Sequence, residues 1–143
     1  MFIPQVRCYH AEAVPQPHAF FILSKGNNAG QPSFKPWVNS FQVICNNNNW
    51  FDFYYWLSYG LFKAGRFKQY QRGTAIPFIN KGDVQEVLKE LAPVIYPDWQ
   101  KYQQIIEALS KLEQRKASLA EQVLATEKLQ SFLIRSYFMQ QGK

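Results

Sequence analysis

The sequence is poor in the residues and motifs that carry covalent and metal chemistry. It has two cysteines and two histidines, and His10 and His18 lack the nearby acids that would complete a metal site. The motifs HExxH, GxSxG and GxGxxG are absent, and "GNNAG" at residues 26–30 is not followed by the Gly-Lys-Ser/Thr of a phosphate-binding loop. We therefore expect no catalytic residue, no metal and no cofactor, and predict that the protein is not an enzyme.

Long apolar runs are also missing, although 47% of the residues are hydrophobic. No stretch approaches the roughly 20 apolar residues that a membrane-spanning helix needs, and the first residues lack the basic-then-apolar pattern of a signal peptide. Cys8 and Cys45 have neither metal-ligand nor CxxC spacing, which favours two free thiols in a reducing cytosol over a disulfide. These absences predict a cytoplasmic protein with no membrane partner.

Acidic residues are scarce in the first part of the chain. Residues 1–81 hold eight Lys/Arg and two acids, whereas residues 82–143 hold eight of each, so the whole formal charge of +6 lies in the first part. Five cations, and no acid, occur between Asp52 and Asp83: Lys63, Arg66, Lys68, Arg72 and Lys81. Such a basic segment indicates a polyanionic partner, the alternative being a solubility bias with no partner.

What is present predicts a small sheet and two helices. "HAFFILSK" (18–25) and "NSFQVIC" (39–45) have the short apolar runs of strands, and the Pro-rich residues 1–18 suggest an irregular arm. An aromatic-rich helix should begin after Asn49 and end at Gly65. Its aromatic side chains favour a core role over a base-stacking platform. A short strand is expected at 76–79, with Ile76 and Ile79 buried, then a helix over 81–91 capped by Asn80 and Asp83 and closed by Pro93.

The longest element should begin after Asp98 and continue without Gly or Pro to Phe138. Its apolar residues recur at spacings of three and four, which is typical of an imperfect heptad seam. Either this helix packs against a second copy, or it breaks near residues 114–118 and folds back as a hairpin. The expected class is thus α+β, with a small α+β domain over residues 1–97 and a helical tail over 98–143. The residues proposed for the interface of the tail are Ile105, Leu109, Leu112, Leu119 and Val123.

Three segments in a fixed order carry a family resemblance. They are "FYYWL" at 53–57, "RGTAIPFINKGDVQEV" at 72–87 and "PDWQKYQQIIEALSKLEQRKASL" at 97–119. Together they resemble the end of a target recognition domain and the start of the spacer helix in specificity subunits of type I restriction–modification systems. The resemblance implies a DNA-reading domain joined to a coiled-coil helix, but it transfers no base contact to any residue here. Through "FFILSKGNNAGQP" at 20–32, the whole chain also resembles a family of short uncharacterised bacterial proteins.

Two functions follow from these patterns. The leading one is a non-enzymatic DNA-binding module in which Lys63, Arg66, Lys68, Arg72 and Lys81 contact phosphates, with Lys25 and Lys35 as further candidates. The alternative is an assembly module that binds another protein, or a second copy, through the C-terminal helix. Convergence of the basic side chains on one face favours the first, and an exposed apolar seam on the tail favours the second.

Overall fold

The computed structural model describes residues 1–142 and has four strands and three α-helices. The strands are β1 (Gln5–Cys8), β2 (Ala19–Leu23), β3 (Pro32–Ser33) and β4 (Ser40–Ile44), and the helices are α1 (Asn48–Lys63), α2 (Lys81–Ile95) and α3 (Trp99–Gln141). Two 3-10 helices, η1 (Lys68–Tyr70) and η2 (Tyr96–Asp98), precede α2 and α3. Met1–Gln103 form one compact unit, and a second begins at Gln104. The predicted α+β class is confirmed.

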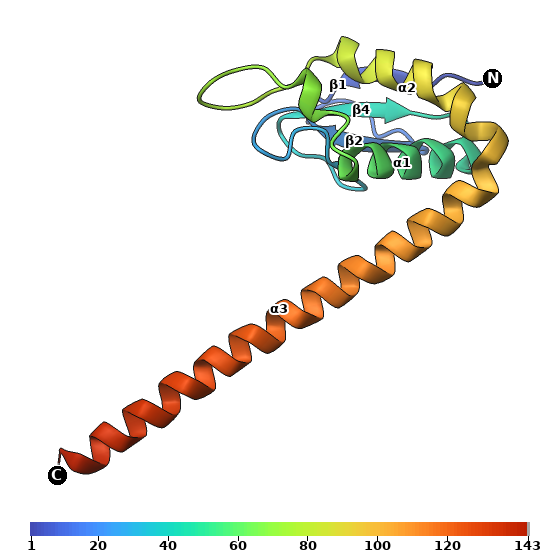
Figure 1. Ribbon diagram of the computed structural model, residues 1–143. Coiled ribbons are helices and arrows are strands. Elements are labelled where there is room, and N and C mark those ends of the chain that lie inside the picture. The colour runs from blue at the N-terminus through green and yellow to red at the C-terminus, as the bar shows by residue number, and fades with distance from the viewer. Residues whose placement is uncertain (143) are drawn as a thin grey trace. The chain divides into compact units, whose positions relative to one another are not determined.

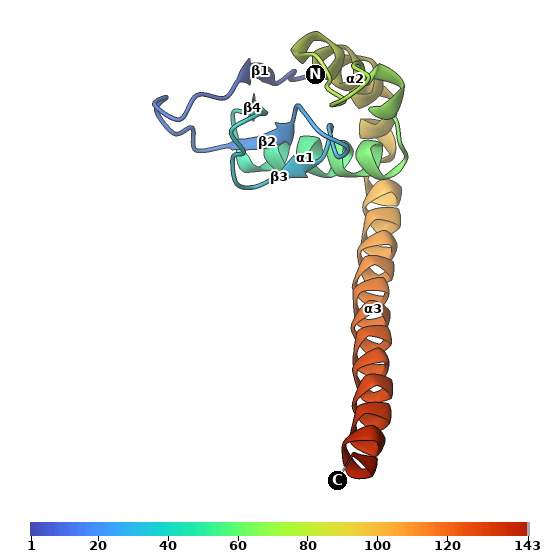
Figure 2. The same cartoon turned by 90° about the vertical axis from the view of Figure 1, so that its left-hand side faces the viewer.

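The sheet is antiparallel throughout, in the order β1-β4-β2-β3 (Figures 1 and 2). The two central strands, β2 and β4, are the two that the sequence predicts. The irregular arm expected over residues 1–18 is wrong in part, because Gln5–Cys8 pair with β4. Only Val6 of this four-residue strand is buried, so the sequence has too short an apolar pattern there to indicate a strand.

Alternate residues of β2 and β4 face a core that α1 and α2 complete. Phe20 lies opposite Val43, and Ile22 opposite Phe41, and these side chains share one cluster with residues of both helices. The aromatic side chains of α1 supply much of that cluster, with Phe53, Tyr54 and Tyr55 buried, so their expected core role is confirmed. The helices therefore cover one face of the sheet, and the opposite face carries Phe21 and Gln42.

Helix α1 has its predicted end and a different start. Its N-cap is Asn47 rather than Asn49, and the Asn47 side chain accepts a hydrogen bond from the Trp50 N–H at 2.9 Å. Four consecutive asparagines are all good caps, so sequence does not distinguish between them. At the other end Gly65 has φ +75°. The Arg66 N–H donates to the Leu61 carbonyl, and the Gly65 N–H donates to that of Phe62, which is a Schellman motif.

Residues 72–79 form a closed loop in place of the expected strand. Arg72 and Phe78 exchange two backbone hydrogen bonds, each 2.9 Å long, and Gly73 turns the chain with φ +91°. Ile79 is buried as predicted, but Ile76 is 65% exposed, so its expected burial is wrong. With Pro77 next to it, Ile76 lies in the turn of the loop, where no sheet faces it. We call residues 72–78 the hairpin loop.

Helices α2 and α3 are both longer than the sequence suggests. Asn80 and Asp83 form the predicted capping box at the start of α2, but the helix passes through Pro93 to Ile95. The buried Ala92 and the partly buried Ile95 belong to the core, and this packing offsets the hydrogen bond that proline removes. Asp98 lies in η2, and α3 follows directly. The hairpin alternative is wrong, because α3 is one helix of 43 residues.

Candidate functional site

The predicted basic residues lie in and around the connection between α1 and α2. Lys63 is in the last turn of α1, Lys68 begins η1, and Lys81 is the first residue of α2. Figure 1 shows this connection at the end of the first unit where α1 ends and α2 begins. The β2–β3 loop joins it there, since the Gly26 N–H donates to the Pro77 carbonyl at 2.8 Å. The fold thus brings the five cations to one end of the unit.

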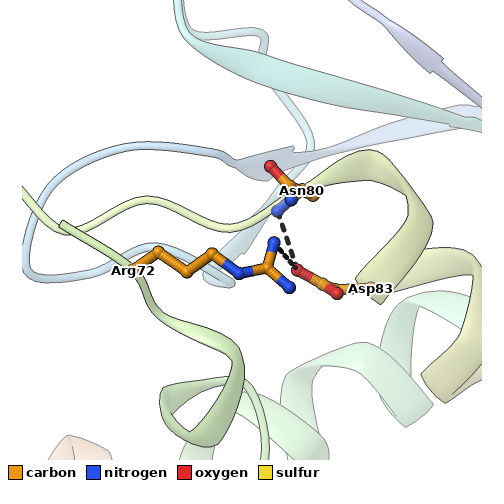
Figure 3. A network of polar contacts seen from close by, with 3 residues as sticks. All are labelled: Arg72, Asn80 and Asp83. Carbon is orange, nitrogen blue, oxygen red and sulfur yellow. Dashed lines mark hydrogen bonds and ion pairs between the residues drawn. The ribbon is translucent and has the colours of Figure 1, made fainter.

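Three of these cations are less available to a phosphate, because Arg72 and Lys63 interact with other side chains and Arg66 is half-buried. The Arg72 Nη1 lies 3.3 Å from the Asp83 Oδ2, and the same oxygen accepts the Asn80 N–H at 3.0 Å (Figure 3). Arg66 is half-buried, and its Nε is buried without a hydrogen-bond partner. The Lys63 ammonium lies 5.7 Å from the centroid of the Tyr59 ring, within cation–π range. Lys68 and Lys81 are exposed, so they are the best placed of the five to meet a phosphate.

A second candidate surface runs along α3. Of the five residues predicted for the tail interface, Ile105, Leu112, Leu119 and Val123 are exposed and Leu109 is half-buried. Sequence reasoning missed a further exposed set near the end of the helix. It comprises Leu129, Phe132, Ile134, Phe138 and Met139. The segment "SFLIRSYFM" (131–139) was the available signal, because six of its nine residues are apolar.

The groups with shifted pKa values belong to the core and not to either surface. Burial raises the pKa of the Cys45 thiol to about 12 and that of the Tyr54 phenol to about 12. The pKa of Tyr102 is also raised to about 12 by burial. Burial alone produces pKa shifts in this direction, so they do not indicate a catalytic role. Within residues 1–142 no three side chains of His, Cys, Asp or Glu are grouped as a metal site requires.

No helix of the described chain combines the length and apolarity needed to cross a bilayer. The fold and the two surfaces define a class: a small α+β unit, basic at one end, followed by a long helix with exposed apolar residues. Residues 6–136 match the model of a protein family described as a family of unknown function (DUF6943), and the chain belongs to that family. No curated protein and no solved structure matches the chain. The family description names no activity, so the likeness to specificity subunits stays a prediction.

Proposed function

We propose that the protein is a non-enzymatic assembly module in which α3 pairs with α3 of a second copy. The observation that carries this proposal is the exposed apolar stripe on α3, which recurs at heptad spacing from Ile105 to Tyr137 and is interrupted by polar residues at 116, 126 and 130. A stripe sustained over roughly five heptads is typical of a coiled coil. An isolated helix draws little stability from its own hydrogen bonds in water, and most helical stability comes from packing an apolar face.

A second copy is the partner that best fits the residues of the stripe. In a parallel, in-register pair Leu112 meets Leu112 and Leu119 meets Leu119, so the apolar positions coincide along the seam. Lys116 and Gln130 occupy a positions and Thr126 a d position. Polar residues in a seam set the register and the number of strands at a cost in stability. Parallel pairing also brings together the two apolar segments 129–139, whereas antiparallel pairing places each of them beside a more polar stretch.

Sedimentation equilibrium of the whole chain tests this proposal. The wild-type chain should have the mass of a dimer, and Leu119→Glu/Val123→Glu should be monomeric because two charges enter the seam. A matched control is Glu121→Gln/Lys128→Gln, which alters two exposed residues on the outer side of the helix and should leave the mass of a dimer. A wild-type chain that is monomeric at its highest soluble concentration would rule the proposal out.

Nucleic-acid binding is the second candidate, and the exposed Lys68 and Lys81 favour it. They lie in a part of the chain with a formal charge of +6, and the likeness to specificity subunits adds support. Arg72 contributes less to this surface than the sequence suggests, because Asp83 offsets its charge. Each phosphate contact should give a slope of about −0.9 in log affinity against log salt. The two functions are compatible, since pairing through α3 would bring two basic ends into one particle.

Fluorescence anisotropy with a labelled DNA duplex tests this second candidate at two salt concentrations. Lys68→Ala/Lys81→Ala should weaken binding. The slope of log affinity against log salt should become shallower by the contribution of about two phosphate contacts. The control is Lys89→Ala/Lys101→Ala, which removes equal charge from exposed positions outside the connection. Equal weakening by both variants would indicate that DNA is attracted to positive charge anywhere on the chain.

We also propose a cytoplasmic location, since Cys8 and Cys45 are both free thiols.

A further inference from the structure

The sheet face opposite α1 and α2 contains a cavity of about 350 Å³. The segment after β1 and the segment between β3 and β4 enclose it, and its lining includes Tyr9, Val14, Phe21, Phe34, Pro36 and Gln42. The Tyr9 and Phe21 rings lie edge to face with centroids 5.3 Å apart. Every residue that lines the cavity is uncharged. A cavity of this size is at the lower end of the range for small-molecule sites.

Gln42 lies at the floor of this cavity, in β4. It lies opposite Phe21 in the register of β2 and β4, and it is only 7% exposed. Its side-chain amide makes no hydrogen bond to any residue among 1–142. Neither amide atom of Gln42 is among the fully buried polar atoms that lack a partner, so the amide is accessible from the cavity. With no partner within the described residues, the amide is open to a polar group of a molecule bound in the cavity.

We propose that this cavity binds a neutral, planar heteroaromatic molecule that carries a hydrogen-bond donor next to an acceptor. The Gln42 amide offers one acceptor oxygen and an NH₂ donor, and such an amide pairs with adenine through two hydrogen bonds. Tyr9 and Phe21 supply aromatic surface for the flat faces of the ligand, whereas the Phe34 ring is stacked on that of Tyr55 in α1, with centroids 4.2 Å apart. A charged ligand is disfavoured, because the uncharged lining does not compensate for its loss of water. The inference is independent of the α3 pairing, since every lining residue lies in the first unit.

Chemical-shift titration of the ¹⁵N-labelled chain tests the cavity with adenine, uracil and nicotinamide as probes. At least one should shift the backbone resonances of residues 9–16 and of Phe21 and Gln42. For that probe Gln42→Leu should weaken binding about tenfold, the effect of losing roughly one good hydrogen bond. Purine serves as a matched ligand when adenine binds, because it lacks the exocyclic amine and should bind more weakly.

The control variant is Gln69→Leu, which makes the same change at an exposed position of η1. It should bind the probe as the wild type does. Gln42→Leu should remain folded, because the substitution removes no hydrogen bond within residues 1–142. Failure of all three probes to shift the cavity resonances up to their solubility limits would overturn the proposal. Equal binding by Gln42→Leu and the wild type would overturn it as well.

Discussion

The Arg72 guanidinium and the Asp83 carboxylate meet at 3.3 Å across the start of α2. The Asp83 oxygen in this contact also accepts the Asn80 N–H at 3.0 Å, so one atom serves both the helix cap and the hairpin loop (Figure 3). The Arg72 side chain is half exposed, whereas that of Asp83 is almost completely buried. The carboxylate therefore fixes where α2 begins and where the hairpin loop is anchored, and it reduces the charge that Arg72 can offer to a phosphate.

Replacement of Asp83 should destabilise the first unit more than replacement of Arg72. Asp83→Ala removes the capping interaction and leaves Arg72 without its partner, so we expect a loss of about 1–2 kcal/mol in the free energy of unfolding. Arg72→Ala removes a partly solvated ion pair and should cost less than about 1 kcal/mol. Urea unfolding followed by circular dichroism at 222 nm measures both losses. Equal losses for the two variants would contradict the dominant role of the cap.

Gly30 packs against Phe67, and Gly82 offers a control substitution at an open position. Gly30 has φ +102°, and a Cβ there would lie 2.6 Å from the Phe67 Cβ, a side chain that is itself buried. Gly30→Ala should therefore cost about 2–4 kcal/mol through backbone strain and overpacking. At Gly82, in the first turn of α2, a Cβ would meet no other part of the fold within 4 Å, so Gly82→Ala should be neutral or stabilising by up to about 1 kcal/mol. Thermal unfolding of both variants measures the two changes in stability. A loss in Gly82→Ala as large as that in Gly30→Ala would contradict the role of the Phe67 contact.

The Tyr102 phenol should make the stability of the first unit depend on pH above about 10. Its O–H donates to the Trp56 carbonyl at 2.7 Å, and burial raises its pKa to about 12. The folded state thus favours the neutral phenol. The resulting stabilisation is complete below the unfolded pKa of about 10 and is lost as pH rises through about 12.

Tyr102→Phe separates this contribution from other groups that titrate at high pH, Tyr54 among them. The variant should be less stable than the wild type at about pH 8.5, because it lacks the hydrogen bond, and the difference should narrow at about pH 11. Urea midpoints of the two proteins at both pH values test the expectation. A constant difference would show that folding does not shift the pKa of Tyr102, and a widening one would show that folding lowers it; either result would contradict the expectation.

The sequence predicts those elements whose signals are local. β2 is a continuous apolar run, β4 is largely apolar, Gly65 is a typical helix end, and Asn80 with Asp83 is a capping box. What it misses depends on contacts between distant segments. β1 exists because β4 offers it an edge, Pro93 stays helical because its neighbours pack in the core, and Arg72 meets Asp83 only when the hairpin loop closes. Gln42 was missed for the same reason, since strand alternation does not reveal whether an amide has a partner.

The parallel pairing of α3 can be tested by a disulfide at one seam position. Leu133 lies in the stripe at heptad spacing from Leu119 and Thr126, so a parallel, in-register pair brings its two copies together within disulfide range. In a Cys8→Ser background, Leu133→Cys should form a covalent dimer on mild oxidation. Cys45 should not compete, because it is buried and its pKa is raised to about 12, which leaves almost no reactive thiolate.

Glu121→Cys in the same background is the matched control, since residue 121 is exposed on the outer side of the helix. It should remain monomeric on a non-reducing gel under the same oxidation. Cross-linking of both variants to the same extent would indicate random collision. A dimer by sedimentation in which Leu133→Cys does not cross-link would instead indicate antiparallel pairing, because that arrangement carries the two positions to opposite ends of the coiled coil.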